Sequence, residues 1–111
     1  MISLELRGDD GKSQQAKAII DTGFSGDLTL PQSMIDSLCL SWLCRQQGLL
    51  ADGSLHTFDV YIGSIAWPGG ERIVEIEAAD IEPLVGMSLL EGNRLTIEVR
   101  GGGKVTIEEL A

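Results

Sequence analysis

Hydrophobic and polar residues alternate in short runs along most of this chain. Residues 2–7 alternate between an apolar and a polar face, and residues 12–20 repeat the alternation after a turn at residues 8–11. A period of two places every second side chain of a β-strand on the same face. The pattern therefore predicts two antiparallel strands joined by a tight turn, followed by a third short strand from Leu28 to Leu30.

The middle of the chain predicts a helix and two hairpins. Pro31 suits the first turn of a short helix that continues through Leu38, because a proline there loses no hydrogen bond that the helix needs. Residues 46–62 predict a long hairpin with its tip at residues 51–54, where an Asp-Gly pair is a turn signal. A second hairpin is predicted to turn at residues 67–70.

The last third of the chain continues in short elements. An apolar approach to Gly86 precedes one or two helical turns at residues 87–91, and two alternating runs at residues 95–99 and 105–110 flank a triple-glycine turn. Many short strands, two short helices and 14 glycines in 111 residues predict one all-β domain. The periodicity predicts a small, highly twisted β-barrel or sandwich spanning residues 1–111.

Charge and hydropathy exclude several classes of partner. Eight basic and seventeen acidic residues give a formal net charge of −9, and such a surface repels nucleic acid and anionic lipid. No apolar stretch reaches the roughly 20 residues that cross a bilayer. The amino terminus also lacks the basic and apolar blocks of a secretory signal. We expect a cytoplasmic protein that binds neither nucleic acid nor membrane.

The two cysteines do not form a recognisable redox or metal motif. Cys39 and Cys44 are five positions apart with apolar neighbours, which predicts ordinary buried thiols in a reducing compartment. His56 is the single histidine, so a zinc site would lack its usual ligands. We expect no metal and no organic cofactor.

One acidic residue is presented in an unusual local setting. Asp21 follows an apolar run and is succeeded directly by Thr22 and Gly23, with Ser25 close behind. Glycine permits the chain to reverse directly after the acid, and the two hydroxyls can donate hydrogen bonds that fix the carboxylate rotamer. This arrangement, which occurs once in the chain, aims a single carboxylate.

A single carboxylate is poorly equipped to hydrolyse an amide alone. Hydrolysis needs one group that takes a proton from water and another that gives a proton to the carbonyl oxygen or the leaving nitrogen. Two neighbouring carboxylates that share one proton can do both. A two-fold homodimer would supply Asp21 twice, facing itself across the symmetry axis.

The motifs and their order resemble one protease family. Asp21-Thr22-Gly23, preceded by Ala-Ile-Ile, resembles the catalytic motif of retropepsin-like aspartic proteases, the single-lobed dimeric relatives of pepsin. Leu84-Val85-Gly86 is similar to the second signature of that family, in which two apolar residues and a glycine precede a short helix. The hairpin at residues 46–62 lies where such proteases carry the flap that closes over substrate. The resemblance covers nearly the whole chain and is greatest to the small stand-alone bacterial members.

This resemblance implies an all-β fold, a small closed β-barrel of the acid-protease type with one or two short helices. It implies an aspartic endopeptidase that hydrolyses peptide bonds of a peptide or protein substrate with a water activated between two Asp21 carboxylates of a homodimer. Thr22 would hydrogen-bond across the dimer axis, and Gly23 would permit the turn and approach the bound peptide. The implied substrate-binding residues are Phe24, Ala51, Asp52, Gly53, Ser54, Val85 and Gly86.

Phe24 departs from the family pattern, in which a small residue often follows the Asp-Thr-Gly motif. Its ring would either narrow a substrate pocket or pack inward against the barrel. This departure keeps open an alternative function, a dimeric β-barrel module that binds a peptide or protein without cleaving it. A third possibility is an unrelated small β-barrel in which Asp21 merely forms a structural Asx-type turn.

Overall fold

The protein folds into a mostly β structure with two short helices, as the sequence predicts. The computed structural model describes residues 1–8, 10–49 and 52–111, so Asp9 of the predicted first turn and Ala51 of the predicted hairpin tip lie outside the described residues. The strands are β1 (Ile2–Arg7), β2 (Ser13–Ile20), β3 (Leu28–Leu30), β4 (Ser41–Leu49), β5 (Leu55–Trp67), β6 (Gly70–Ala78), β7 (Leu84–Val85), β8 (Asn93–Ile97) and β9 (Val105–Glu109). The helices are α1 (Gln32–Ser37) and α2 (Met87–Leu90).

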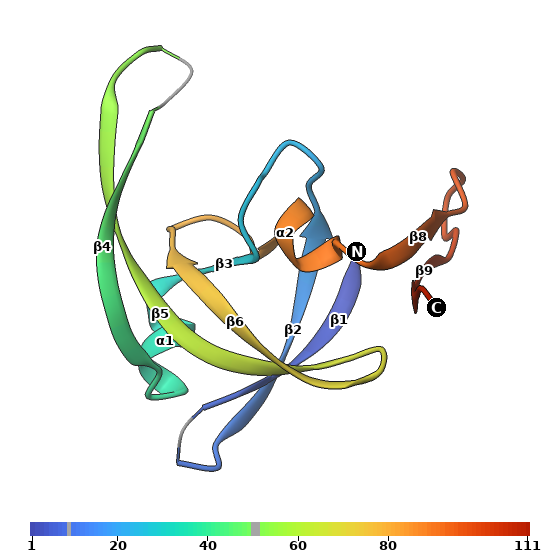
Figure 1. The fold of residues 1–111 in the computed structure, drawn as a ribbon, viewed down its shortest axis with the longest axis horizontal. Coiled ribbons are helices and arrows are strands. Elements are labelled where there is room, and N and C mark those ends of the chain that lie inside the picture. Colours follow the sequence, from blue (N-terminus) through green and yellow to red (C-terminus); the bar gives the residue numbers. More distant parts are fainter. Residues whose placement is uncertain (9, 50–51) are drawn as a thin grey trace.

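Seven of the strands form one sheet in the order β1-β2-β7-β3-β6-β5-β4. A further pairing of β1 with β5, through Leu6 and Ile65, links six of these strands in a ring, and β4 lies outside it as the partner of β5 (Figure 1). The pairs β2–β7 and β3–β6 are parallel, whereas β3–β7 is antiparallel. Short β7 therefore lies between the strand that precedes Asp21 and the strand that follows residue 27.

The alternating positions of the first two strands pack into a single core, as their pattern predicts. Leu4 and Leu6 of β1 are buried, as are Ala16 and Ala18 of β2, while the residues between them are half-buried or exposed. The core continues into both helices and into β3, β5, β6 and β7. Burial of apolar surface at about 25 cal/mol per Å² is the main force that holds such short elements together.

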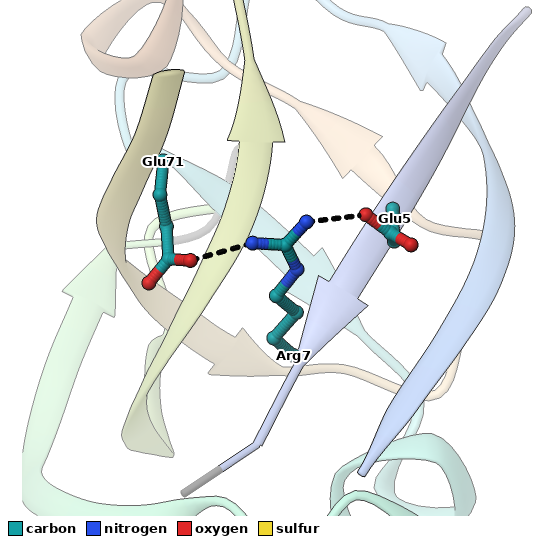
Figure 2. A network of polar contacts seen from close by, with 3 residues as sticks. All are labelled: Glu5, Arg7 and Glu71. Atoms are coloured by element: carbon teal, nitrogen blue, oxygen red, sulfur yellow. Dashed lines mark hydrogen bonds and ion pairs between the residues drawn. The ribbon is translucent and has the colours of Figure 1, made fainter. Parts of the chain in front are cut away.

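A polar contact joins β1 to β6 across the intervening β5. The Arg7 guanidinium donates through Nη2 to Glu5 Oε2 at 2.7 Å and through Nη1 to Glu71 Oε2 at 2.6 Å. Figure 2 shows Arg7 extended between these two carboxylates. The pKa of Arg7 is raised, first by the hydrogen bond to Glu5 and next by the one to Glu71. Exposed ion pairs add little stability, so the contact contributes little to the free energy of unfolding.

The long hairpin is longer than the sequence predicts. Strand β4 already begins at Ser41 and β5 continues to Trp67, so the predicted residues 46–62 form only the outer part of the arm (Figure 1). A register shift between Trp42 and Cys44 marks an irregularity in its pairing. We call β4, β5 and their connection the flap hairpin. Its outer part rises beside the loop that joins β2 to β3 (Figure 1).

The prediction that both cysteines are buried is wrong. Cys39 is exposed and Cys44 is half-buried, and both thiols are free. Cys39 has a φ of 52°, in the left-handed region, where the chain reverses between α1 and β4. This reversal turns Leu38 and Leu40 into the core and leaves the thiol between them outside.

The C-terminal residues form a separate two-stranded sheet. Strands β8 and β9 pair with each other in antiparallel fashion and project from the body of the molecule (Figure 1). Both predicted strands are present, although β8 ends at Ile97 and Val99 lies beyond it. No helix in the described ranges has the length and apolar character needed to cross a membrane.

Candidate active site

Asp21 directly follows β2 and is held by its own turn. Its Oδ1 accepts a hydrogen bond from the Gly23 amide nitrogen at 2.9 Å, and its carbonyl oxygen accepts one from the Phe24 amide at 3.1 Å. The side chain is half-buried, whereas Thr22 and Gly23 are exposed. We call residues 21–24 the Asp21 turn. The backbone amide of Gly23 thus orients the carboxylate, in the role that sequence analysis assigned to the hydroxyls of Thr22 and Ser25.

The loop from residue 21 to residue 27 is hydrogen-bonded along its length to the segment around Gly86. The donor and acceptor pairs are Asp21 N to Val85 O at 2.9 Å, Gly86 N to Asp27 O at 2.9 Å, Met87 N to Phe24 O at 2.8 Å and Ser88 N to Gly26 O at 3.2 Å. These bonds continue the pairing of β7 with β2 and β3. The structure therefore brings the two predicted motifs into direct contact, although they are far apart in sequence.

Gly86 is needed at this contact because its neighbours leave no space for a side chain. Its φ of −103° and ψ of 177° are open to any residue, so backbone freedom is not the reason for glycine here. A Cβ at this position would collide with the Gly26 carbonyl oxygen and would lie 2.6 Å from Phe24 Cδ2. The absence of a side chain lets the second motif approach the loop this closely.

A buried threonine adds a side-chain hydrogen bond between β3 and β7. Thr29 of β3 is 5% exposed, and its Oγ1 accepts a hydrogen bond from the Leu84 amide nitrogen at 3.0 Å. A buried amide without an acceptor is costly, so this hydroxyl stabilises the start of β7. Thr29 is not among the predicted site residues, and its signal in the sequence is a hydroxyl residue in the middle of an apolar strand.

A cavity of about 400 Å³ lies between the loop after β2, the flap hairpin and β6. Half-buried Phe24, the last residue of the Asp21 turn, lines it, and its ring also lies close to Gly26 and Gly86. The ring thus narrows a pocket and packs against its own loop. The ring lines this cavity, as one expectation for Phe24 has it, but it is not among the residues that form or pack against the hydrophobic core.

Three carboxylates on the lining of this cavity were not singled out in the sequence. They are Asp27, which precedes β3, and Glu75 and Glu77 of β6. Asp27 Oδ2 accepts a hydrogen bond from the Glu75 amide nitrogen at 3.0 Å. Burial raises the pKa of Glu77, and the negative charges of Glu75 and Asp27 raise it further. The available signal was the alternation of Glu75 and Glu77 with buried Val74 and Ile76.

The tip of the flap hairpin forms a compact exposed turn. Asp52 Oδ1 accepts hydrogen bonds from the Ser54 hydroxyl at 2.6 Å and from the Ser54 amide at 2.9 Å, which lowers the pKa of Asp52. Gly53 has a φ of 85°, a value that glycine adopts without strain. In Figure 1 the tip stands apart from the Asp21 turn, so the structure does not bring these predicted substrate-binding residues together with Asp21. Ala51, the remaining predicted tip residue, lies outside the described ranges.

Neither a metal site nor a comparison with known proteins assigns a role to these residues. Within the part of the chain that the structure describes, no three or more His, Cys, Asp or Glu side chains are grouped so as to hold a metal ion. No protein-family model, curated protein or solved structure matches the chain. The interpretation of the site therefore depends on its own geometry and chemistry.

Proposed function

We propose that this protein is an aspartic endopeptidase of the retropepsin-like type that acts as a homodimer. The observation that carries the proposal is the hydrogen bonding between the Asp21 turn and the segment around Gly86. A chance Asp-Thr-Gly triplet has no reason to be bonded to an apolar-apolar-glycine segment from the far end of the domain. An Asp21 turn oriented by such a segment fits a catalytic role better than a merely structural Asx-type turn.

The fold supports the same proposal. Six strands are linked in a ring, and the flap hairpin rises from that ring on the side of the loop that joins β2 to β3 (Figure 1). We propose that this ring is the small closed β-barrel of the acid-protease type, with the flap hairpin as the cover over bound substrate. An extended peptide would lie between the flap hairpin and the Asp21 turn, bound through backbone hydrogen bonds and through pockets for its side chains.

The proposed chemistry needs two copies of one side chain. In the dimer, one Asp21 carboxylate accepts a proton from the attacking water while the other, protonated, gives its proton to the carbonyl oxygen of the scissile bond. Water oxygen bonds to the carbonyl carbon. The nitrogen then takes the proton that one carboxylate holds as the C–N bond breaks, and a hydroxyl of the tetrahedral intermediate returns its proton to the other carboxylate as the C–O double bond re-forms. The pair ends with one shared proton, as it began, and no enzyme–substrate bond is formed.

Exposed surface on the single chain supports association with a second copy. Thr22 is exposed and its hydroxyl has no hydrogen-bond partner among the described residues, so it is available to bond across the dimer axis. Ile97, Val99 and Leu110 at the C-terminal hairpin are 49%, 93% and 46% exposed. Exposed apolar side chains on a projecting hairpin are available for another chain to cover.

The test compares the wild type with Asp21→Asn, which keeps an oxygen to accept the Gly23 amide but removes the acid. Both proteins are incubated with a diverse peptide library from acidic to neutral pH, and the products are identified by mass spectrometry. Cleavage by the wild type alone is expected. Cleavage at the same sites by Asp21→Asn would contradict the mechanism. A dimeric wild type that binds peptides and cleaves none of them would instead support a non-cleaving binding module.

A further inference from the structure

We infer that the cavity beside the Asp21 turn is a specificity pocket that accepts a basic side chain, arginine or lysine, of the substrate. The inference rests on the proposed protease function and adds a substrate class to it. We call this cavity, of about 400 Å³ and lined by both the loop after β2 and the flap hairpin, the acidic pocket.

The position of the acidic pocket relates it to catalysis. Phe24, which forms part of its wall, is the residue directly after Gly23 of the Asp21 turn. The opposite wall includes Phe58 and Val60 of β5, in the flap hairpin. A peptide held between the flap hairpin and the Asp21 turn would therefore pass the opening of this pocket close to the bond that is cleaved.

The charge of the acidic pocket determines what it selects. Its lining includes Asp27, Glu75 and Glu77 and contains no lysine or arginine. The five ion pairs among the described residues all involve other carboxylates. Three carboxylates without a cation repel one another, and a cation from the substrate relieves that repulsion. An acidic side chain in the same place would add to it.

The apolar walls of the acidic pocket suit the methylene stem of a basic side chain. Phe24, Phe58 and Val60 offer apolar surface for the methylene stem of arginine or lysine, whose charged head then reaches the carboxylates. A planar guanidinium presents five N–H donors and suits carboxylates that approach from several directions. The combination of apolar walls with a few polar groups is also common in ligand pockets.

Glu77 has the position expected of the selecting residue. Its carboxylate lies over Gly26, where a Cβ would collide with Oε2, so the glycine makes room for the acid. The carboxylate is half-buried and receives no hydrogen bond or ion pair from another described residue. Burial raises its pKa, which means that the ionised form lacks compensation in the free protein. A bound cation would supply that compensation.

The experiment measures binding without cleavage. Asp21→Asn protein is titrated into labelled peptides that are identical except for arginine, lysine, methionine or glutamate at one position, scanned along the peptide. Fluorescence anisotropy reports the affinity at neutral pH. At one position, the basic peptides should bind at least about tenfold more tightly than the methionine peptide, and added salt should reduce the difference. Equal affinity for basic and methionine peptides at every position would overturn the inference.

Variants assign the preference to the acidic pocket. Glu75→Gln and Glu77→Gln, singly and together in the Asp21→Asn background, should reduce the basic preference stepwise. Glu82→Gln removes one negative charge from an exposed site outside the pocket and should leave the preference unchanged. Retention of the full preference in the double variant would contradict the assignment, and so would an equal loss in Glu82→Gln. Each variant keeps a side chain of similar size, and its circular dichroism spectrum reports whether it has folded.

Cleavage assays of the wild type distinguish a failure of this inference from a failure of the proposed function. Cleavage by the wild type but not by Asp21→Asn, with no preference for basic peptides, would support the protease and overturn the acidic pocket. Preferential binding of basic peptides with no cleavage by the wild type would support the pocket as a binding site and contradict the protease.

Discussion

The amide nitrogen of Asp21 donates a hydrogen bond to the carbonyl oxygen of Val85 at 2.9 Å. This bond lies at the end of the parallel pairing of β2 with β7, in which Ile20 is the partner of Val85. The candidate catalytic residue is thus fixed by the last bond of a β-ladder, immediately before the chain turns. Changes in the second motif should therefore affect Asp21.

Gly86→Ala should impair both stability and catalysis. The added methyl group would meet the Gly26 carbonyl oxygen and the Phe24 ring, which cannot move without disturbing the bonds that orient the Asp21 turn. Overpacking of this kind costs about 1–3 kcal/mol of unfolding free energy. A misplaced catalytic group can lower kcat/KM about a hundredfold. Urea unfolding and peptide cleavage measure the two effects.

Gly101→Ala is the matched control for this substitution. A Cβ at Gly101 meets nothing within 4 Å, and the residue is exposed, so both stability and activity should stay close to those of the wild type. The proposed role of Gly86 would be refuted by a Gly86→Ala protein as stable and active as Gly101→Ala.

Thr29→Val should destabilise the protein through a lost hydrogen bond. The substitution keeps the shape of the buried side chain but removes the acceptor of the Leu84 amide, and an unsatisfied buried donor costs about 1–3 kcal/mol. Urea unfolding should show this loss for Thr29→Val and a smaller one for Thr29→Ser, which retains the hydroxyl. Thr57→Val, at an exposed position of β5, is the control. Equal stability of the two valine variants would contradict the account of Thr29.

Glu77 should make stability depend on pH in a defined direction. Its pKa in the folded protein is raised above the ordinary value of 4.5 by burial and by the charges of Glu75 and Asp27. Between the two values the folded state binds more protons than the unfolded state, so this residue's contribution to stability falls as pH rises. Glu77→Gln removes the penalty and should be more stable than the wild type at neutral pH.

The measurement for Glu77 is the difference in unfolding free energy between wild type and Glu77→Gln at a series of pH values. That difference should favour the variant increasingly as pH rises from about 4.5, the ordinary value of the carboxyl pKa. The size will be modest because the side chain is only half-buried. A difference that is independent of pH, or that changes in the opposite direction, would show that Glu77 is not destabilised in its ionised form.

The two thiols should differ in reactivity in the native protein. Cys39 is exposed and Cys44 is half-buried, so a thiol reagent such as iodoacetamide should modify Cys39 first. Peptide mapping by mass spectrometry after short exposures identifies the modified residue, and Cys39→Ser should remove the faster phase. Faster modification of Cys44, or protection of both thiols until the protein unfolds, would contradict the exposure of Cys39.

The strands could be anticipated from sequence because local pattern encodes them. Alternation with a period of two identified β1 and β2 directly, and Gly23 indicated the tight turn after Asp21. The acidic pocket could not be found in this way. It depends on the parallel pairing of β3 with β6, which aligns Leu28 with Ile76 and so sets Asp27 beside Glu75.

The cysteines show a second limit of sequence patterns. Apolar neighbours favoured burial of Cys39, but burial is decided by the direction in which each side chain leaves the backbone. A single left-handed residue after α1 reverses the chain and exposes the thiol between two core leucines. A non-glycine residue in this conformation is uncommon, and the hydrophobic pattern gives no sign of it.

The measurement that tests the central claim most directly is the activity of mixed dimers. Wild type and Asp21→Asn are unfolded together and refolded at varied ratios, and peptide cleavage is measured at constant total protein. If each active site needs Asp21 from both subunits, activity follows the square of the wild-type fraction, so an equal mixture retains about a quarter of the full activity. Activity in direct proportion to the wild-type fraction would contradict the shared site.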